Sequence, residues 1–259
     1  MTKANALEET KKNEIAVINF EEDAGLGHEN VSLADRQMPY INLLQALSPM
    51  LDEDDPSHIE GAKEGSIFIT DSKTIVDGKE GIKIIPCRYK RHFCEWIPRE
   101  QGGGLVAMHS PESPLIAKAH KVKDPANPKK TILQTPDGNT LVETAQFFVL
   151  AFYNNEWHWA VLNMSGTKWS AARELNTLST TRKIPGTDKL LPTFAGVYNL
   201  TSFKDQNKTG QKYANFKVAF DKLVDDPVVY ALAKEYYNIS KNLTVLAAED
   251  ATESQEVNY

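Results

Sequence analysis

The chain has 259 residues, of which 41% are hydrophobic and 25% charged, a composition typical of a globular protein and not of a disordered or collagen-like chain. No apolar run approaches the roughly 18 residues that a membrane helix needs, and the polar, acid-rich N-terminus does not predict a secretion signal. The net charge of −6 is unevenly distributed: residues 1–60 hold 4 basic and 13 acidic residues, residues 61–220 hold 22 and 14, and residues 221–259 hold 3 and 8. A basic centre between acidic ends is typical of a protein with a polyanionic partner, although an excess of this size also occurs on ordinary solvated surfaces.

The first part of the chain changes from acidic and polar to β-forming. Residues 1–35 hold many acids and few large apolar side chains, so we expect a flexible N-terminal segment. Residues 39–47 predict a short helix or strand. From Gly65 the pattern is that of short strands, at 66–70 and 73–76.

A long extended stretch at 82–97 has imperfect alternation, which indicates a bulge near Pro86. Residues 110–130 hold several prolines and lysines and predict a basic, mobile loop.

Two hairpins separated by a helix follow. The first joins 140–153 to 157–164 through a turn that begins with two asparagines, and the second joins 194–203 to 213–220. Between the hairpins, residues 167–181 have apolar side chains at helical spacing.

A final helix opens at Asp226-Pro227, with Val228, Leu232 and Tyr236 on one stripe. Many antiparallel strands with one interposed and one terminal helix predict a mainly β fold with some α, namely an elaborated OB-like antiparallel barrel with a C-terminal helix and an acidic tail.

Enzyme signatures are absent from the sequence: there is no phosphate-binding loop, dinucleotide-binding glycine motif or nucleophile elbow. Cys87 and Cys94 suit a reduced, cytoplasmic chain, and their spacing of seven on a predicted strand does not favour a disulfide. No zinc-binding spacing accompanies them. We therefore expect a protein that is not an enzyme and has no metal or cofactor.

Aromatic and basic side chains alternate in the long strand and in the second hairpin. Unpaired bases stack on flat rings of any such surface while Lys and Arg neutralise the phosphates, so binding of this kind tolerates any sequence and weakens with salt. The predicted DNA-binding residues are Arg88, Tyr89, Lys90, Arg91, Phe93 and Trp96, with Lys168, Arg173, Lys204, Lys208, Lys212 and Tyr213 alongside. Half of each strand points inward, so other aromatic side chains are expected in the core: Phe147, Phe148, Phe152, Trp157, Phe220 and Tyr230.

The sequence resembles an OB-fold single-stranded DNA-binding protein of a tailed bacteriophage. The resemblance is carried by segments 39–49, 86–96 and 147–164 and by the acidic C-terminus. The resemblance implies one DNA-binding domain over residues 36–246 that coats unwound DNA in replication, recombination and repair in the host cytoplasm. It also implies that the tail, residues 247–259, recruits replication or recombination proteins through Glu249, Asp250, Glu253, Glu256 and Tyr259. The segment around 100–135 is larger than the loop of a minimal OB module.

Two other classes of protein stay open. The basic centre is also compatible with a phage structural or assembly protein in which it packs against acidic ends of neighbouring copies. The acidic loop beside His58 is compatible with a metal-dependent nuclease that uses Asp52, Asp54 and Asp55.

Overall fold

The computed structural model describes residues 21–31, 37–124, 131–207, 210 and 212–243. The chain divides into two units, Met1–Arg36 and Gln37–Tyr259. The described part of the first unit, residues 21–31, is a succession of turns closed by short-range bonds such as that from the Leu26 N–H to the Asp23 carbonyl (3.1 Å).

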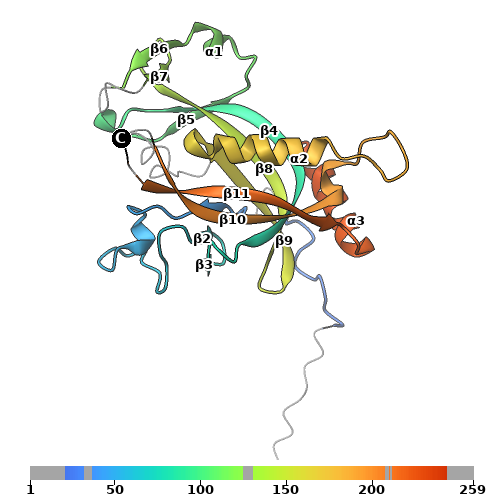
Figure 1. Ribbon diagram of the computed structural model, residues 1–259. Helices are drawn as coiled ribbons and strands as arrows, with labels where there is room; N and C mark the ends of the chain where they lie inside the picture. The colour runs from blue at the N-terminus through green and yellow to red at the C-terminus, as the bar shows by residue number, and fades with distance from the viewer. Residues whose placement is uncertain (1–20, 32–36, 125–130, 208–209, 211, 244–259) are drawn as a thin grey trace, which may run out of the picture. The chain divides into compact units, whose positions relative to one another are not determined.

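An antiparallel sheet of eight strands forms the body of the second unit (Figure 1). The two longest strands, β4 and β8, take different neighbours along their lengths: β4 pairs with β10 near its start and with β5 near its end, and β8 pairs with β7 and then β9. The predicted mainly β fold with a C-terminal helix is confirmed. The strands are β4 (Ile82–Trp96), β5 (Leu105–His109), β6 (His120–Lys123), β7 (Thr131–Gln134), β8 (Thr140–Tyr153), β9 (Glu156–Ser165), β10 (Gly196–Gln206) and β11 (Lys212–Leu223).

Four strands have Greek-key order, since β4, β8 and β9 lie side by side and β10 returns to the other side of β4. An OB fold is a partly open Greek-key barrel, but the barrel expected here is not closed. In the described part of the chain β9 and β11 share no ladder, because the segment that contains β1 (Ile41–Leu43) contacts both. The Val161 N–H donates to the Pro39 carbonyl (2.8 Å), and the Ala214 N–H donates to Gln45 Oε1 (3.0 Å).

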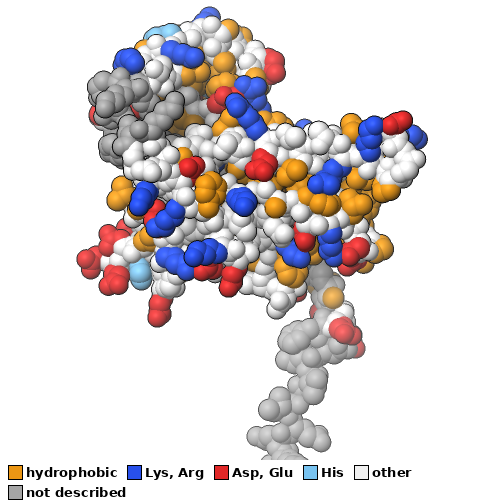
Figure 2. Space-filling model, viewed as in Figure 1, with side chains coloured by type: hydrophobic (Ala, Val, Ile, Leu, Met, Phe, Trp, Pro, Cys, Tyr) orange, Lys and Arg blue, Asp and Glu red, His pale blue; other side chains and the backbone are white. Residues whose placement is uncertain are grey.

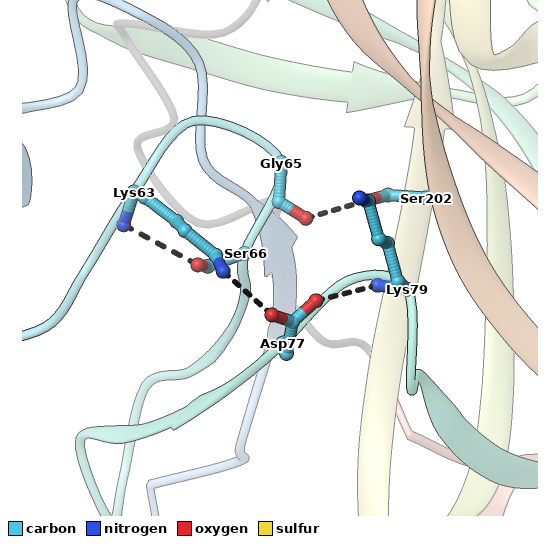
Figure 3. Close-up of polar contacts among 6 residues, drawn as sticks. All are labelled: Lys63, Gly65, Ser66, Asp77, Lys79 and Ser202. Atoms are coloured by element: carbon cyan, nitrogen blue, oxygen red, sulfur yellow. Dashed lines mark hydrogen bonds and ion pairs between the residues drawn. The ribbon is translucent and has the colours of Figure 1, made fainter.

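A second, three-stranded sheet consists of β1, β2 (Ile67–Ile69) and β3 (Thr74–Val76). Its turns are joined to β10 by hydrogen bonds of Ser202 to Gly65 and to Gly78, which we call the β10 clasp; Figure 3 shows the contact between Ser202 and Gly65. Ser202 Oγ donates to the Gly65 carbonyl (2.5 Å), and the Ser202 N–H donates to the Gly78 carbonyl (2.6 Å). Position 78 requires glycine, because a Cβ there would lie 1.9 Å from both the Gly65 oxygen and Ser202 Oγ.

The turns and bulge expected from the sequence are present. Asn154 and Asn155 both have positive φ (51° and 65°), as a type I′ turn between β8 and β9 requires. The β4–β8 register shifts between Pro86 and Arg88, which places the predicted bulge at Cys87. The expectation of a loop over 110–130 is wrong for part of that range, because α1 (Pro114–Lys118) and β6 lie within it.

Two longer helices, α2 (Trp169–Thr180) and α3 (Pro227–Ser240), pack on opposite faces of the sheet. Ala172 of α2 belongs to the core cluster that contains Phe147, whereas Tyr236 of α3 contacts Phe148 (ring centroids 6.0 Å apart), and successive strand residues face opposite ways. Short 3-10 helices occur at Pro49–Leu51, Arg99–Gln101, Gly166–Lys168 and Thr193–Ala195. Within the described residues, no helix is long and apolar enough to cross a membrane.

The buried stripe of α3 differs from the predicted one. Ala233, Tyr236 and Ser240 are buried, whereas Val228 is 76% exposed because it lies in the first turn, beyond the sheet contact. Two aromatic side chains predicted in the core, Phe152 and Tyr230, are instead exposed at 36% and 37%.

Candidate nucleic-acid interface

A solvent-open pocket of about 270 Å³ lies where α2 crosses β4 and β8. We call it the α2 pocket; its lining residues are Tyr89, Arg91, Glu143, Trp169, Ala172, Arg173 and Asn176. Tyr89, Arg91 and Arg173 were predicted from the sequence as DNA-binding residues, and the fold brings them together from β4 and α2. The sequence analysis used Trp169 only as one of the apolar residues at helical spacing over 167–181, so its contribution to the pocket was missed, as were those of Glu143 and Asn176.

The rings of the α2 pocket are held by packing beneath it. Tyr89 packs on the buried Phe147 ring (centroids 5.1 Å apart, planes at 48°) and remains 38% exposed on its other side. Trp169 packs against the core, and the Arg91 guanidinium lies 6.0 Å from the centre of its ring. Burial raises the pKa of Tyr89, so its phenol is neutral at physiological pH. A supported, partly exposed Tyr89 ring beside the indole of Trp169 is suited to stacking on a flat ligand.

The charge of the α2 pocket is positive but partly balanced. Arg91 forms an ion pair with Glu143 of β8, which lies two residues before Ala145, the residue opposite Arg91. Among the residues that the structure describes, no carboxylate pairs with the exposed Arg173. An anion that enters the pocket therefore meets Arg173, which has no carboxylate partner among the described residues, and competes with Glu143 for Arg91.

The bulge at Cys87 decides which basic side chains of β4 reach the α2 pocket. After it, Tyr89 and Arg91 point to the α2 side, whereas Arg88 and Lys90 point to the α3 side, where Lys90 Nζ lies 5.2 Å from the centre of the Phe148 ring. The four side chains, which the sequence analysis predicted together as DNA-binding residues, therefore do not share one face of the sheet.

Two further predicted residues, Lys168 and Phe93, are buried, and Trp96 is half-buried. Lys168 is 4% exposed, with Nζ 6.0 Å from the centre of the Phe216 ring, because it lies between α2 and β11. Phe93 is 9% exposed, and the indole N–H of Trp96 is buried without a hydrogen-bond partner. Lys168 and Phe93 are therefore not accessible to a strand of DNA in this conformation.

The β10–β11 hairpin carries the remaining predicted residues. Lys204 is exposed and pairs with Glu64 (2.8 Å), Lys212 is exposed, and the Tyr213 hydroxyl donates to Asp205 (3.0 Å). Asp205 also accepts from Asn215 Nδ2 (3.2 Å), which contacts the Thr167 carbonyl (3.4 Å) just before α2. The hairpin is thus joined to the start of α2, and Figure 2 shows Lys and Arg over this face, interspersed with acidic side chains. Lys208 and the five tail residues, Glu249, Asp250, Glu253, Glu256 and Tyr259, lie outside the described residues.

The cysteines are buried in the fold, and two aspartates of the acidic loop accept hydrogen bonds from the backbone. Burial raises the pKa of Cys87 to about 12 and that of Cys94 to about 11, so both free thiols stay protonated and poorly nucleophilic at neutral pH. Asp52 and Asp55 accept hydrogen bonds from backbone N–H groups of their own loop. No group of three or more His, Cys, Asp or Glu side chains in the described ranges is placed to hold a metal ion.

Fold and pocket together define a mainly β protein with a Greek-key sheet, a large insertion between its first two long strands, and an aromatic, arginine-containing pocket beside its central helix. The chain belongs to the family of Pam3 phage gp34-like proteins, whose model matches residues 8–245. It is therefore a member of a bacteriophage protein family. No curated protein and no solved structure matches it.

Proposed function

We propose that the protein binds single-stranded DNA without sequence preference and protects it during phage DNA replication, recombination and repair. The observation that carries the proposal is the α2 pocket, in which the rings of Tyr89 and Trp169 lie beside the guanidinium groups of Arg91 and Arg173. Aromatic platforms with adjacent cations are the combination that unpaired nucleotides require, since every base has a face that can stack.

The size of the pocket favours unpaired over paired strands. Its volume of about 270 Å³ is close to the lower end of the roughly 300–1,000 Å³ that sites for whole small ligands occupy, so it is suited to one nucleotide. A base in a duplex is covered by its stacked neighbours and cannot enter without being flipped out of the helix, which costs a few kcal/mol.

Fluorescence anisotropy of a labelled oligo(dT) and of a duplex of equal length, each at two salt concentrations, tests the proposal. We expect tight binding of the single strand, weaker binding of the duplex and a steep loss of affinity with salt. Tyr89→Ala should weaken binding by about 1–3 kcal/mol, which is about 5- to 150-fold in Kd. Failure to bind any oligonucleotide, together with large assemblies in sedimentation, would instead support the structural or assembly class.

A matched pair of variants separates the α2 pocket from general surface charge. Arg91 and Lys83 are both on β4, are 50% and 48% exposed, and each pairs with one carboxylate, Glu143 and Asp221. Arg91→Ala should weaken binding and reduce the salt slope by about 0.7, the value for one phosphate contact on a single strand. Lys83→Ala, which lies outside the pocket, should leave both quantities unchanged, and equal effects of the two variants would contradict the proposed location.

The acidic tail belongs to the same proposal. Residues 249–259 carry four acids and no bases, so they can compete with DNA for the basic surface and bind partner proteins when DNA displaces them. Deletion of 249–259 should leave the affinity for oligo(dT) equal or higher, and a clear fall in affinity would contradict this competition.

A further inference from the structure

The face of the sheet opposite the α2 pocket carries a second group of cationic and polar side chains. Arg88, Lys90 and His92 alternate along β4 and therefore point the same way; we call them the β4 cation row. Lys90 lies opposite the buried Gln146 of β8, which in turn lies opposite Asn163 of β9, so polar side chains continue across two more strands.

Several polar atoms on this face are buried without a hydrogen-bond partner. They are Arg88 Nη1, His92 Nε2 and Asn163 Oδ1, and His92 as a whole is only 6% exposed. Buried donors and acceptors are nearly always paired, because an unpaired one has lost its water without gaining a partner. Three such atoms on one face therefore indicate a site that is completed by a ligand.

The charge of the β4 cation row indicates what kind of ligand. Lys90 Nζ donates to the Leu243 carbonyl, but within the described ranges no carboxylate pairs with Lys90 or Arg88. Burial, and then the charge of Arg88, lower the pKa of Lys90, and burial together with Lys90 lowers the pKa of His92 to about 4. At neutral pH the row thus holds two positive charges, with no carboxylate partner among the described residues, beside a neutral imidazole that can donate one hydrogen bond.

We propose that Arg88, Lys90 and His92 form a binding site for a phosphate dianion on the α3 side of the sheet. A terminal or inorganic phosphate carries about −1.5 to −2 charges at neutral pH, which matches the two cations, and it accepts several hydrogen bonds at once. Arg88 supplies a planar donor fork, Lys90 a point charge and His92 a neutral donor. The site does not depend on the proposed binding of single strands, because Tyr89 and Arg91 point to the other face.

Titration of the full-length protein with sodium phosphate at constant ionic strength tests the proposal, followed by the thermal unfolding midpoint and by the side-chain NMR resonances of His92. We expect a saturable rise in the midpoint and a saturable shift of the His92 imidazole signals. Arg88→Met and Lys90→Met should each weaken phosphate binding at least about tenfold, and Lys83→Met, on the same strand but away from the row, should not.

Non-saturable effects, an unmoved His92 signal, or an equal loss in Lys83→Met would overturn the proposal. The His92 signal of the unsubstituted protein decides the question even if the Arg88 and Lys90 variants do not fold. A comparison of oligo(dT) that carries a 5′-phosphate with oligo(dT) that carries a 5′-hydroxyl then distinguishes the two sources of the phosphate. Tighter binding of the 5′-phosphate form, reversed by free phosphate, assigns the site to the end of a strand. Equal binding of the two forms assigns the site to free phosphate. If 5′-hydroxyl oligo(dT) binds but phosphate changes neither the unfolding midpoint nor the His92 signals, the phosphate site is rejected and the proposed binding of single strands is not.

Discussion

Replacement of Gly78 by alanine tests how the β10 clasp joins the small sheet to the main one. The new Cβ would lie 1.9 Å from the Gly65 carbonyl oxygen and from Ser202 Oγ, so the turn must move away from β10. That movement breaks two hydrogen bonds, Ser202 N–H to Gly78 O (2.6 Å) and Ser202 Oγ to Gly65 O (2.5 Å). Each bond contributes about 1 kcal/mol, and the overpacking costs about 1–3 kcal/mol more, so we expect a loss of about 3–5 kcal/mol.

Urea unfolding followed by tryptophan fluorescence measures this loss, and Gly103→Ala provides the control. Gly103 has a φ of +68° but no atom within 4 Å of an added Cβ, so alanine there meets only the backbone penalty of about 1–2 kcal/mol. If Gly78→Ala were no less stable than Gly103→Ala, the close approach of the turn to β10 would be refuted.

Three further variants test separate parts of the structure. Glu143→Gln removes the carboxylate that pairs with Arg91, so oligo(dT) should bind more tightly in anisotropy titrations; weaker binding would argue against competition between Glu143 and phosphate. Tyr236→Phe removes the hydroxyl that donates to the buried Ala160 carbonyl (3.1 Å) and should cost about 1–3 kcal/mol in urea unfolding, whereas no loss would show that water replaces this bond. Hydrogen bonds from the backbone of Gln206 and from Asn215 lower the pKa of Asp205 in the folded protein. The contribution of the Asp205 carboxylate to folding stability is therefore complete above the unfolded-state pKa of about 3.9, and it is lost as the pH falls through the lower pKa of the folded state. Asp205→Asn should therefore lose stability at pH 7 and be less sensitive to acid below about pH 4, and an unchanged acid profile would contradict this role.

Local patterns in the sequence were sufficient to predict most elements. The paired asparagines at 154 and 155 specify the turn between β8 and β9, and Asp226-Pro227 specifies the start of α3, where Asp226 accepts from the Val228 N–H (2.8 Å). Signals of this kind depend on neighbouring residues only, so they remain valid whatever the tertiary structure is.

The composition of the candidate site depended on long-range features that the sequence does not reveal. One extra residue at Cys87 reverses the facing of every later side chain on β4, so Tyr89 and Arg91 are separated from Arg88 and Lys90. Lys168 was predicted as a DNA-binding residue because it is basic, but packing of α2 against β11 buries it beside the Phe216 ring. The sheet does not close into a barrel, because the segment around β1, predicted as a short helix or strand, contacts both β9 and β11.

The quenching of tryptophan emission by oligo(dT), compared between the unsubstituted protein and Trp169→Phe, is the most direct test of the proposed function. The protein has four tryptophans, and of these Trp169 lines the α2 pocket. If unpaired bases stack there, the single strand should quench the emission of the unsubstituted protein, and most of that quenching should be absent from Trp169→Phe, which keeps a ring and should still bind. Full quenching in Trp169→Phe, or none in either protein at saturating oligo(dT), would contradict the account.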